Sequence, residues 1–443
     1  MTHPSREPFL PYTELLKKVE DKTARIVVVG LGYVGLPLAL EFARAGYRVT
    51  GYDKDEAKVA HLNFGESHIG DVASTELSPF VKKGLLDAST DPAVLDGADA
   101  VVVCVPTPLG KTKDPDMGFI ATATAEIAAH QHEGMLIVLE STTYPGTTRE
   151  VLVPKLTRGY QLGRDVFVAF SPERVDPANA EYNTRNTPKV IAGSTERCLE
   201  VATALYAHII DTLVPVSNTD SAEMVKLLEN TFRAVNIALV NEVALMSRRL
   251  GIDVWEVIRA AATKPFGFMP FFPGPGLGGH CIPVDPLYLS WKLRSLKFQA
   301  RFIELADSIN SAMPTHVVAR LTEALNDRGQ AVKGSRLLLA GVAYKPEVSD
   351  VRESPAFDVL HGLLRLGADV SYVDPHVPQI DEPGLSMTGV SPFASFAAYD
   401  AVIVITHHRS LDWQRMLAEA RLIVDTRDAL REVPGDRSKI VSL

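Results

Sequence analysis

The most reactive side chain of the sequence is a cysteine in a segment dense in glycine and proline. Cys281 lies within Gly276–Pro286 (GLGGHCIPVDP), and a cysteine in such a loop can be open to a ligand. Its nucleophilic form is the thiolate, which nearby positive charge or helix N–H groups favour. Asp285 could orient a water molecule or act as a base, while His280 could tune the thiol, contact a substrate or make structural hydrogen bonds. The segment predicts nucleophilic catalysis, and the alternative is a packed loop cysteine beside a turn aspartate.

A glycine-rich motif has the spacing of a dinucleotide-binding turn. The motif, Gly30–Gly35 (GLGYVG), stands directly between a predicted strand and a predicted helix. Gly30 permits a tight turn, Gly32 lets the backbone approach a pyrophosphate, and Gly35 allows close packing of helix and strand. Asp53 ends the next strand and would accept hydrogen bonds from a ribose 2′-hydroxyl, which favours NAD over NADP. The alternative is a glycine turn that binds nothing.

A lysine and an asparagine share one face of a long predicted helix. Lys226 and Asn230 are four residues apart, and an ammonium with a side-chain amide suits the stabilisation of an oxyanion. An unpaired ammonium among apolar neighbours is costly unless it serves a polar site. Taken alone, Lys226 is better explained as a solvated lysine at the rim of the helix.

Two polar loops follow predicted strands. They are Glu140–Gly146 (ESTTYPG) and Phe170–Arg174 (FSPER). Ligands of open α/β sheets bind beyond the carboxyl ends of the strands, so Thr142 and Glu173 could meet a substrate or hold a water molecule. Each loop alone is a weak signal.

Strands alternate with helices in the first and the last parts of the chain, which indicates doubly wound parallel sheets. The predicted strands of the first part are 26–29, 47–53, 100–105, 136–140 and 166–170. The last part repeats this rhythm more faintly, with strands at 336–341, 370–374, 400–406 and 421–425 and a helix at 355–366. The sequence therefore predicts two Rossmann-like doubly wound α/β domains, 1–214 and 329–443, joined by a helical domain, 215–328.

The helical domain is built on one long central helix. Ser221–Arg249 contains no glycine or proline, and its apolar residues recur at helical spacing. Shorter helices are predicted at 253–262 and 302–325, on either side of the Pro/Gly-rich segment 265–286. Because the long helix carries more apolar surface than one domain junction needs, we expect it to form the core of a homodimer. The alternative is burial between the two α/β domains.

Composition sets the remaining limits. The 443 residues are 46% hydrophobic and 22% charged, as in ordinary globular proteins, and the formal net charge of −9 argues against a dedicated nucleic-acid binder. No apolar run has the length of a membrane span and no secretory signal is visible, so we expect no membrane partner and a cytoplasmic location. Three cysteines provide no disulfide framework and no metal-ligand spacing, and we expect no metal. Cys104 falls in a predicted strand and Cys198 in a helical stretch, where both are structural.

The ordered set of motifs resembles the UDP-glucose/GDP-mannose dehydrogenase family over nearly the whole chain. The matching segments are GLGYVG, the PTP of 106–108, STTYPGTT, SPER, KLLEN, GGHCIPVDP and GVAYKPEVSDVRES. Within the family, SPER and GGHCIPVDP resemble the branch that acts on nucleotide-activated N-acetylhexosamines. The longer string FFPGPGLGGHCIPVDPLYLSWK is similar to bacterial UDP-N-acetylglucosamine 6-dehydrogenases.

The resemblance implies a four-electron oxidation of C6 of a UDP-sugar to the carboxylate with two NAD, for surface polysaccharide biosynthesis. Cys281 would attack the C6 aldehyde to give a thiohemiacetal, and a second oxidation would give a thioester that water hydrolyses. The family assigns oxyanion stabilisation to Lys226 and Asn230 and proton transfer near the thiol to Asp285. A covalent adduct keeps the reactive aldehyde in place while the cofactor is exchanged.

The family also implies further contacts. Thr142 and Glu173 would position the hydrolytic water. The cofactor contacts would be Gly30, Gly32, Tyr33, Val34, Gly35, Asp53, Lys58, Thr107, Thr142 and Arg352. The substrate contacts would be Glu173, Arg174, Lys226, Asn230, Phe271, Gly278 and Lys345.

The sequence departs from the UDP-glucose branch at two places. Pro177 stands where that branch has a second glutamate, whose role is lost or moved to Asp176. Lys264 lies near the position from which that branch brings an arginine across a subunit interface, so substrate contact across a dimer is one expectation.

The sequence leaves several functions open. The sugar could be UDP-N-acetylglucosamine, its N-acetylgalactosamine or N-acetylmannosamine counterpart, or UDP-glucose, because a few pocket atoms decide between them. A two-electron dehydrogenase of the 3-hydroxyacid or 6-phosphogluconate type would not need Cys281. A catalytically silent NAD and nucleotide-sugar sensor would not need Cys281, Lys226, Asn230 and Asp285 together.

Overall fold

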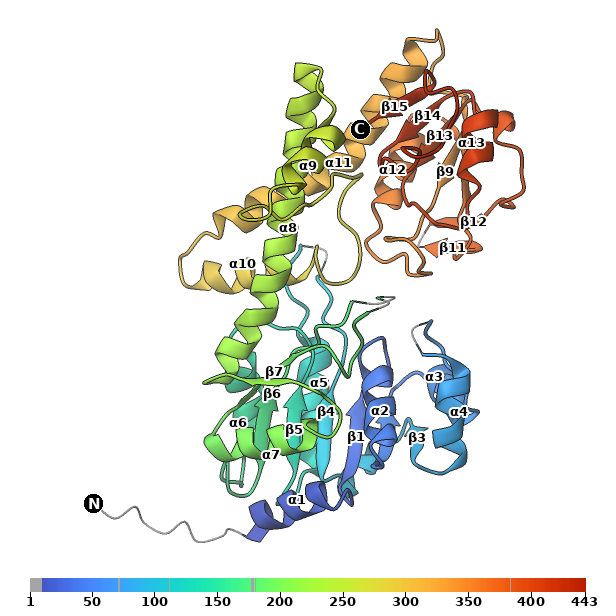
Figure 1. Cartoon of the computed structure of the whole chain (residues 1–443). Coiled ribbons are helices and arrows are strands. Elements are labelled where there is room, and N and C mark those ends of the chain that lie inside the picture. The colour runs from blue at the N-terminus through green and yellow to red at the C-terminus, as the bar shows by residue number, and fades with distance from the viewer. Residues whose placement is uncertain (1–9, 71, 111, 177–178, 180, 383) are drawn as a thin grey trace. The chain divides into compact units, whose positions relative to one another are not determined.

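The structure is a computed structural model, and it describes residues 10–70, 72–110, 112–176, 179, 181–382 and 384–443 (Figure 1). The chain divides into two compact units. The first contains the residues up to Glu229 together with Trp291–Lys297, and the second contains Asn230–Ser290 and Phe298–Leu443.

The first unit is built on an eight-stranded sheet in the order β3-β2-β1-β4-β5-β6-β7-β8, in which only the β6–β7 pairing is antiparallel. Its strands are β1 (Arg25–Val29), β2 (Arg48–Tyr52), β3 (Leu86–Ser89), β4 (Ala100–Val103), β5 (Leu136–Leu139), β6 (Phe167–Phe170), β7 (Lys189–Gly193) and β8 (Leu213–Pro215). The central strands are apolar runs buried on both faces, as covered parallel strands must be.

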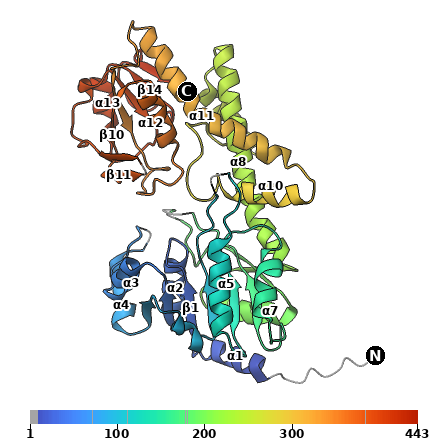
Figure 2. The ribbon, with the colours of Figure 1, turned by 180° about the vertical axis from the view of Figure 1, so that it is seen from behind.

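Helices cover both faces of this sheet, and Figure 2 shows α5 lying over one of them. One apolar core contains side chains of α1 (Leu10–Glu20), α2 (Gly35–Arg44), α3 (Glu56–Asn63), α4 (Ser74–Lys82) and α7 (Glu196–Tyr206). The opposite core contains side chains of η1 (Pro92–Gly97), α5 (Gly118–His130), η2 (Thr148–Leu152) and α6 (Val153–Leu156). Two cores on one sheet define the doubly wound arrangement that the sequence predicted.

The second unit contains a five-stranded parallel sheet in the order β10-β9-β13-β14-β15. Its strands are β9 (Arg336–Ala340), β10 (Asp369–Val373), β13 (Ala401–Val404), β14 (Ile423–Asp425) and β15 (Ile440–Ser442), and a hairpin adds β11 (Gln379–Glu382) and β12 (Leu385–Thr388). The order matches β2-β1-β4-β5-β6 of the first sheet, which confirms a second Rossmann-like domain. Helices α11 (Arg301–Asn326) and α12 (Pro355–Arg365) pack on one face of the sheet, and α13 (Trp413–Glu419) and η3 (Phe396–Ala398) on the other.

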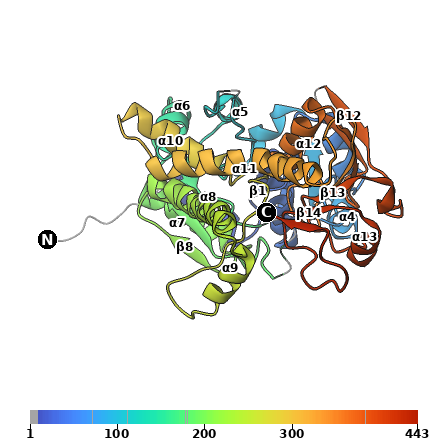
Figure 3. The same cartoon turned by 90° about the horizontal axis from the view of Figure 1, so that it is seen from above.

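One long helix, α8 (Thr219–Leu250), was predicted at 221–249 and extends slightly beyond both ends. In the second unit α11 lies beside it (Figure 3), and the Asn241 amide donates to Asn310 Oδ1 at 2.9 Å. The unit also contains α9 (Val254–Ala262), which the Asp253 side chain caps. None of the helices in the described part of the chain combines the length and apolar character of a membrane span.

The structure differs from the predicted elements at several places. The strand expected at 100–105 ends at Val103, so Cys104 lies just beyond the strand and not within it. Helix α10 (Asp285–Ser295), which begins inside the Pro/Gly-rich segment 265–286, was not predicted. Proline is tolerated in the first turn of a helix, where its missing N–H has no partner, so Pro286 does not prevent this start. The short strands β3, β7 and β8 of the first sheet were missed.

Candidate active site

The glycine turn after β1 has the space that a dinucleotide requires. Gly30 adopts φ +92°, and a Cβ there would lie 2.6 Å from the carbonyl oxygen of Cys104. A Cβ on Gly35 would lie 1.8 Å from the carbonyl oxygen of Gly30, whereas one on Gly32 would meet nothing within 4 Å. The N-terminus of α2 has no side-chain cap at Val34, and Tyr33 and Val34 are half-buried. The turn therefore fits a pyrophosphate, with open space at Gly32 and N–H groups at the helix start.

Asp53 lies beside this turn at the carboxyl end of β2. Its Oδ2 accepts the N–H of Leu31 at 2.8 Å, and its Oδ1 accepts the N–H of Asp55 at 3.0 Å. The Lys58 ammonium is 3.7 Å from Oδ2. Each carboxylate oxygen has two lone pairs, so these bonds fix Asp53 without using all its acceptor capacity. Thr107 lies half-buried in the loop after β4.

The loop that carries Thr142 is tied to α8 by a residue that the sequence analysis missed. The buried Glu223 accepts the N–H of Gly146 at 2.5 Å, and the N–H and hydroxyl of Thr148 at 2.8 and 2.7 Å. Burial raises the pKa of Glu223 to about 7, because desolvation outweighs these hydrogen bonds. Thr142 itself is half-buried. No local sequence signal marked Glu223, since the acidic residue in the first turn of α8 is Asp220.

Glu173 follows β6 and is held through both of its oxygens. Oε1 accepts the N–H groups of Arg174 and Val175 at 2.6 and 2.8 Å, and Oε2 lies 3.3 Å from the Lys189 ammonium. Burial raises the pKa of Glu173, but the Lys189 charge, the two N–H groups and the Lys226 charge outweigh it and lower the pKa overall. Glu173 is therefore an ionised hydrogen-bond acceptor.

Arg174 makes its contacts within the first unit. One nitrogen of its guanidinium lies 2.6 Å from Glu229 Oε1, and another donates to the carbonyl of Pro188 at 2.6 Å. Asp176 is exposed, and Pro177 lies outside the described residues.

Lys226 and Asn230 both lie on the buried side of α8. Lys226 is 8% exposed, which excludes a solvated lysine at the helix rim. The Asn230 amide donates to Asp285 Oδ2 at 2.5 Å, and Asp285 is the first residue of α10. The amide has two N–H donors, of which this bond uses one.

Cys281 lies at the turn that leads into α10. Its carbonyl accepts the N–H groups of Val284 and Asp285 at 3.0 and 2.8 Å, so Cys281 opens the turn that directly precedes α10. Cys281 is partly exposed, whereas Cys104 and Cys198 are buried. The N–H groups of a helix start favour negative charge nearby, which suits a reactive thiol.

The glycine loop before Cys281 packs on the loop after β9. A Cβ on Gly278 would lie 2.7 Å from the Cβ of Tyr344, and the N–H of Gly279 donates to the carbonyl of Arg352 at 3.0 Å. Arg352 pairs with Asp350 at 2.6 Å and contacts His280 Nδ1 at 3.2 Å, so His280 makes a structural hydrogen bond.

Three other predicted residues have different surroundings. Lys345 lies with its ammonium 6.0 Å from the Tyr344 ring centroid. Phe271 packs edge-on against Phe232 at 5.7 Å. Lys264 is exposed, 5.1 Å from the Phe266 ring.

Arg427 is a second residue that the sequence analysis missed. It follows β14, donates from Nε to the carbonyl of Ile405 at 2.8 Å, and lies where a Cβ on Gly274 would come within 2.4 Å of its guanidinium. Burial lowers the pKa of Arg427 to about 10, against the charge of Asp425. A half-buried guanidinium with several donors suits an anionic ligand. Its place at the carboxyl end of a strand was the available signal.

One side-chain cluster has the composition of a cation site. Ligand atoms of Glu347, His376 and His408 lie within 4.8 Å of one another. His408 already accepts the N–H of Glu347 at Nδ1 and contacts Asp374 through Nε2 at 3.0 Å. Asp374 also accepts the N–H groups of Val342 and Ala343, as Asp53 accepts that of Leu31, so the cluster holds the loop after β9.

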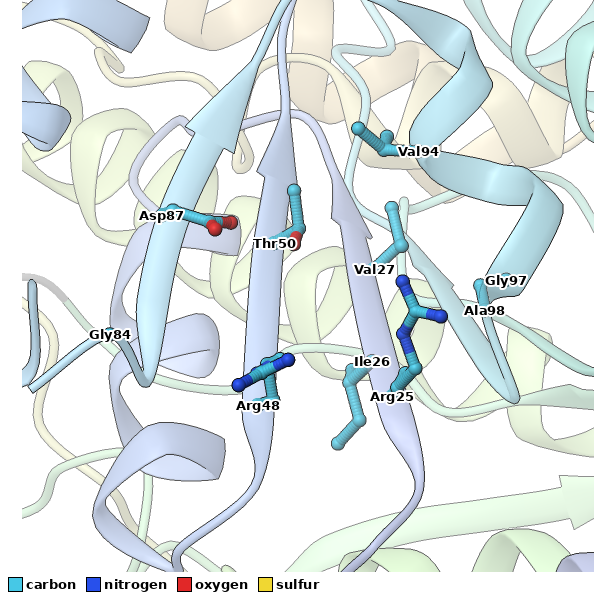
Figure 4. Close-up of a pocket in the computed structure, with 10 residues that line it drawn as sticks. All are labelled: Arg25, Ile26, Val27, Arg48, Thr50, Gly84, Asp87, Val94, Gly97 and Ala98. Carbon is cyan, nitrogen blue, oxygen red and sulfur yellow. The ribbon is translucent and has the colours of Figure 1, made fainter.

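A pocket in the first unit lies away from the glycine turn (Figure 4). It lies over β1, β2 and β3 and is lined by Arg25, Arg48, Thr50 and Asp87 among others. Arg25 and Arg48 begin their strands, whereas ligands of parallel α/β sheets bind beyond the carboxyl ends. The pocket is therefore not the predicted ligand site.

Comparison with known proteins identifies the chain. Three models of the UDP-glucose/GDP-mannose dehydrogenase family match it: the NAD binding domain over 24–210, the central domain over 220–312 and the UDP binding domain over 338–432. UDP-N-acetyl-D-glucosamine 6-dehydrogenase of Pseudomonas aeruginosa is 36% identical over 87% of this chain and 91% of its own. UDP-N-acetyl-D-mannosamine dehydrogenase of Escherichia coli is also 36% identical, over 87% and 94%. The solved structure of UDP-D-ManNAc dehydrogenase from Pyrococcus horikoshii superposes with a TM-score of 0.85 at 33% identity, covering 94% of this chain and 98% of that one. The chain thus belongs to the UDP-glucose/GDP-mannose dehydrogenase family of NAD-dependent nucleotide-sugar dehydrogenases.

Proposed function

We propose that the protein oxidises C6 of a UDP-N-acetylhexosamine, UDP-N-acetylglucosamine foremost, to the uronic acid used for surface polysaccharides. Relatives named for UDP-N-acetylglucosamine and for UDP-N-acetylmannosamine support the substrate class. The observation that carries the proposal is the partly exposed Cys281 at the start of α10, with Asn230 bonded to Asp285 in the same unit. UDP-N-acetylmannosamine, UDP-N-acetylgalactosamine and UDP-glucose are the alternative substrates.

Cys281 is the proposed nucleophile. Bound NAD supplies the hydride acceptor, and each of the two oxidations consumes one molecule. The Cys281 sulfur forms a bond to the aldehyde carbon, and the thiohemiacetal loses a hydride and a proton to become a thioester. Water then breaks the carbon–sulfur bond, which releases the carboxylate and the free thiol. Asp285 supports proton transfer at the sulfur, and its hydrogen bond holds the Asn230 amide in place.

Lys226 and Asn230 are the proposed oxyanion donors. The ammonium of Lys226 is buried, and Asn230 has a second N–H besides the one that it gives to Asp285. Donors fixed in advance stabilise the charge that develops on the reacting oxygen without reorganising in the transition state.

Glu173 and Thr142 are the proposed positioning groups for the hydrolytic water. Since Glu173 is held as a carboxylate, it accepts a hydrogen bond from that water and does not store a proton. The remaining substrate contacts proposed are Arg174, Phe271, Gly278 and Lys345. The proposed cofactor contacts are Gly30, Gly32, Tyr33, Val34, Gly35, Asp53, Lys58, Thr107, Thr142 and Arg352. We also propose that the chain has three functional parts: 1–214 binds NAD, 215–328 forms the dimer and 329–443 binds the UDP-sugar.

The direct test is the stoichiometry of NADH production with a panel of UDP-sugars. We expect two NADH for each UDP-N-acetylglucosamine consumed and lower kcat/KM for the other sugars. One NADH per sugar would indicate a two-electron dehydrogenase. NAD binding without NADH production from any sugar would indicate a sensor.

The protein is also proposed to form a homodimer through α8. Six large apolar side chains of this helix are exposed: Met224, Leu228, Phe232, Leu239, Met246 and Leu250. At about 100° per residue they fall within an arc of about 80°, a single stripe along the helix. A contiguous apolar stripe of this length favours association with a second copy, in keeping with an isologous interface.

A further inference from the structure

A lysine is buried between two carboxylates in the first unit. Lys189 begins β7 and is 3% exposed. Its ammonium lies 2.7 Å from Glu140 Oε2 and 3.3 Å from Glu173 Oε2, and it donates to the carbonyl of Pro172 at 3.3 Å. Three acceptors thus match the three donors of the ammonium.

The far side of this group is equally fixed. Glu140 is buried directly after β5, at the start of the loop that carries Thr142. Its Oε1 accepts the hydroxyl of Tyr206 on α7 at 2.5 Å. The chain of contacts Tyr206–Glu140–Lys189–Glu173 therefore ends at the carboxylate proposed to position the hydrolytic water.

We propose that Lys189 is a positioning residue of the active site, which holds Glu173 in one orientation as an ionised acceptor. This inference rests on the proposed function for the role of Glu173. Tyr206 fixes the Glu140 carboxylate, which fixes the Lys189 ammonium, and the ammonium in turn fixes Glu173. Stability alone explains the group poorly, because an apolar set of similar volume is often as stable as a buried ion pair, or more stable.

The hydrogen bonds of Glu173 leave one acceptor site for the proposed water. A carboxylate offers about four acceptor sites. The N–H groups of Arg174 and Val175 and the ammonium of Lys189 use three of them. The remaining site has a fixed direction, which is what a positioned nucleophilic water requires.

The charge of Lys189 affects the pKa of Glu173, which can be measured. Burial raises the pKa of Glu173, and Lys189 is the largest of the influences that lower it. The other titratable groups acting on Glu173 are Lys226 on α8, Glu140 after β5, Cys104 after β4 and Tyr206 on α7. Without Lys189 the effect of burial remains, and Glu173 takes up a proton at a higher pH.

The experiment compares a paired variant with the wild type. Lys189→Met alone leaves the buried Glu140 without its cationic partner, which destabilises the fold, so the double variant is the main test. The double variant Glu140→Gln/Lys189→Met removes both buried partners and preserves the local charge balance. Lys155→Met is the matched control, since Lys155 lies on α6 of the same unit and donates to the carbonyl of Ala121.

The readouts are the pH profile of steady-state turnover and the titration of Glu173. We expect turnover of the double variant to fall at least about tenfold near pH 6 and to recover near pH 9, with Lys155→Met following the wild type. Slow hydrolysis should also produce a burst of two NADH per active site before the steady state. A folded double variant with wild-type pH profile and no burst would overturn the inference.

A direct titration separates this inference from the proposed function. The carbon-13 carboxyl resonance of Glu173, assigned by its loss in Glu173→Gln, should titrate at higher pH in the double variant than in the wild type. This measurement needs no turnover. If the wild type oxidises no UDP-sugar, the proposed function fails, while the resonance still decides whether Lys189 controls Glu173.

Discussion

Among the three cysteines, burial separates the candidate nucleophile from the structural ones. Desolvation raises the pKa of the Cys104 thiol well above its usual range, and it also raises the pKa of the Cys198 thiol. Only Cys281 is partly exposed. A thiol must ionise to act as a nucleophile, so Cys281 is the cysteine that fits the proposed role.

Cys281→Ser should lose turnover by at least about 10³-fold, because a serine hydroxyl replaces the thiol as nucleophile and leaving group. NAD affinity should stay within about twofold of wild type, since the glycine turn is unchanged. Steady-state NADH production and NAD titration by calorimetry test both points. Cys198→Ala is the control, and undiminished uronic acid formation by Cys281→Ser would exclude the covalent route.

Some site residues are recognisable from sequence motifs, and others only from their contacts in the folded protein. Asn230 and Asp285, from separate segments, meet at 2.5 Å as partners. Lys189, Glu223 and Arg427 stand in no motif that we interpreted. Their importance comes from what surrounds them in the interior, and a charged residue in a sequence looks the same whether it becomes buried or solvated.

At the scale of elements, the turn between β1 and α2 shows three glycines with two different functions. Gly30 and Gly35 are required by backbone contacts inside the turn, whereas Gly32 faces open space. The first two are conditions of folding and the third is a condition of ligand approach.

Gly32→Ala should therefore leave the Tm of the unliganded protein within about 1 °C of wild type and weaken NAD binding at least about tenfold. Gly35→Ala should destabilise the fold by more than about 2 kcal/mol, because its Cβ would overlap the Gly30 carbonyl. Thermal unfolding with and without NAD distinguishes them. Equal loss of Tm in both variants without NAD would contradict this assignment.

Glu223 couples the start of α8 to the Thr142 loop, and the coupling depends on pH. Its folded-state pKa of about 7 lies above the ordinary 4.5, so the folded protein binds this proton more tightly than the unfolded chain. The resulting stabilisation is complete below about pH 4.5 and is lost as the pH rises through about 7.

Glu223→Gln cannot titrate, so its free energy of unfolding relative to wild type should rise by about 3 kcal/mol between pH 4.5 and pH 8. Urea unfolding at several pH values measures the difference. Glu133→Gln on the exposed surface is the control. A constant difference between Glu223→Gln and wild type across this range would show that Glu223 does not carry the proton.

At the scale of the whole molecule, the apolar stripe of α8 is exposed to solvent. Leu228 is 59% exposed and Leu239 is 53% exposed, far more than large apolar side chains in a core. Burying this stripe against a second copy would remove it from water, which is the driving force expected for the dimer.

Leu228→Glu/Leu239→Glu should raise the dimer dissociation constant at least about 10²-fold, because two apolar contacts are lost and charges enter the interface. Sedimentation velocity over a concentration series measures the change. Phe64→Glu, at an exposed apolar residue away from α8, should keep the wild-type mass. A wild type that is monomeric throughout would remove the proposal.

The sequence by itself determined the alternation of strands and helices, the glycine turn, the long helix and the family. These features depend on local periodicity and on motifs of neighbouring residues, which are legible along the chain. It also predicted the second Rossmann-like domain, which the strand order of the second sheet confirms. The three-part division of the chain and the residue roles remain predictions.

Only the tertiary structure decided which charged residues are buried and what they contact. Three contacts join residues more than fifteen positions apart: Asn230 with Asp285, Lys189 with Glu173, and Glu223 with Gly146 in the Thr142 loop. Short strands such as β8, and the start of α10, were not predicted from the sequence, because contacts with other segments stabilise them. Hydrogen bonding and desolvation act through space, so no local pattern in the sequence records them.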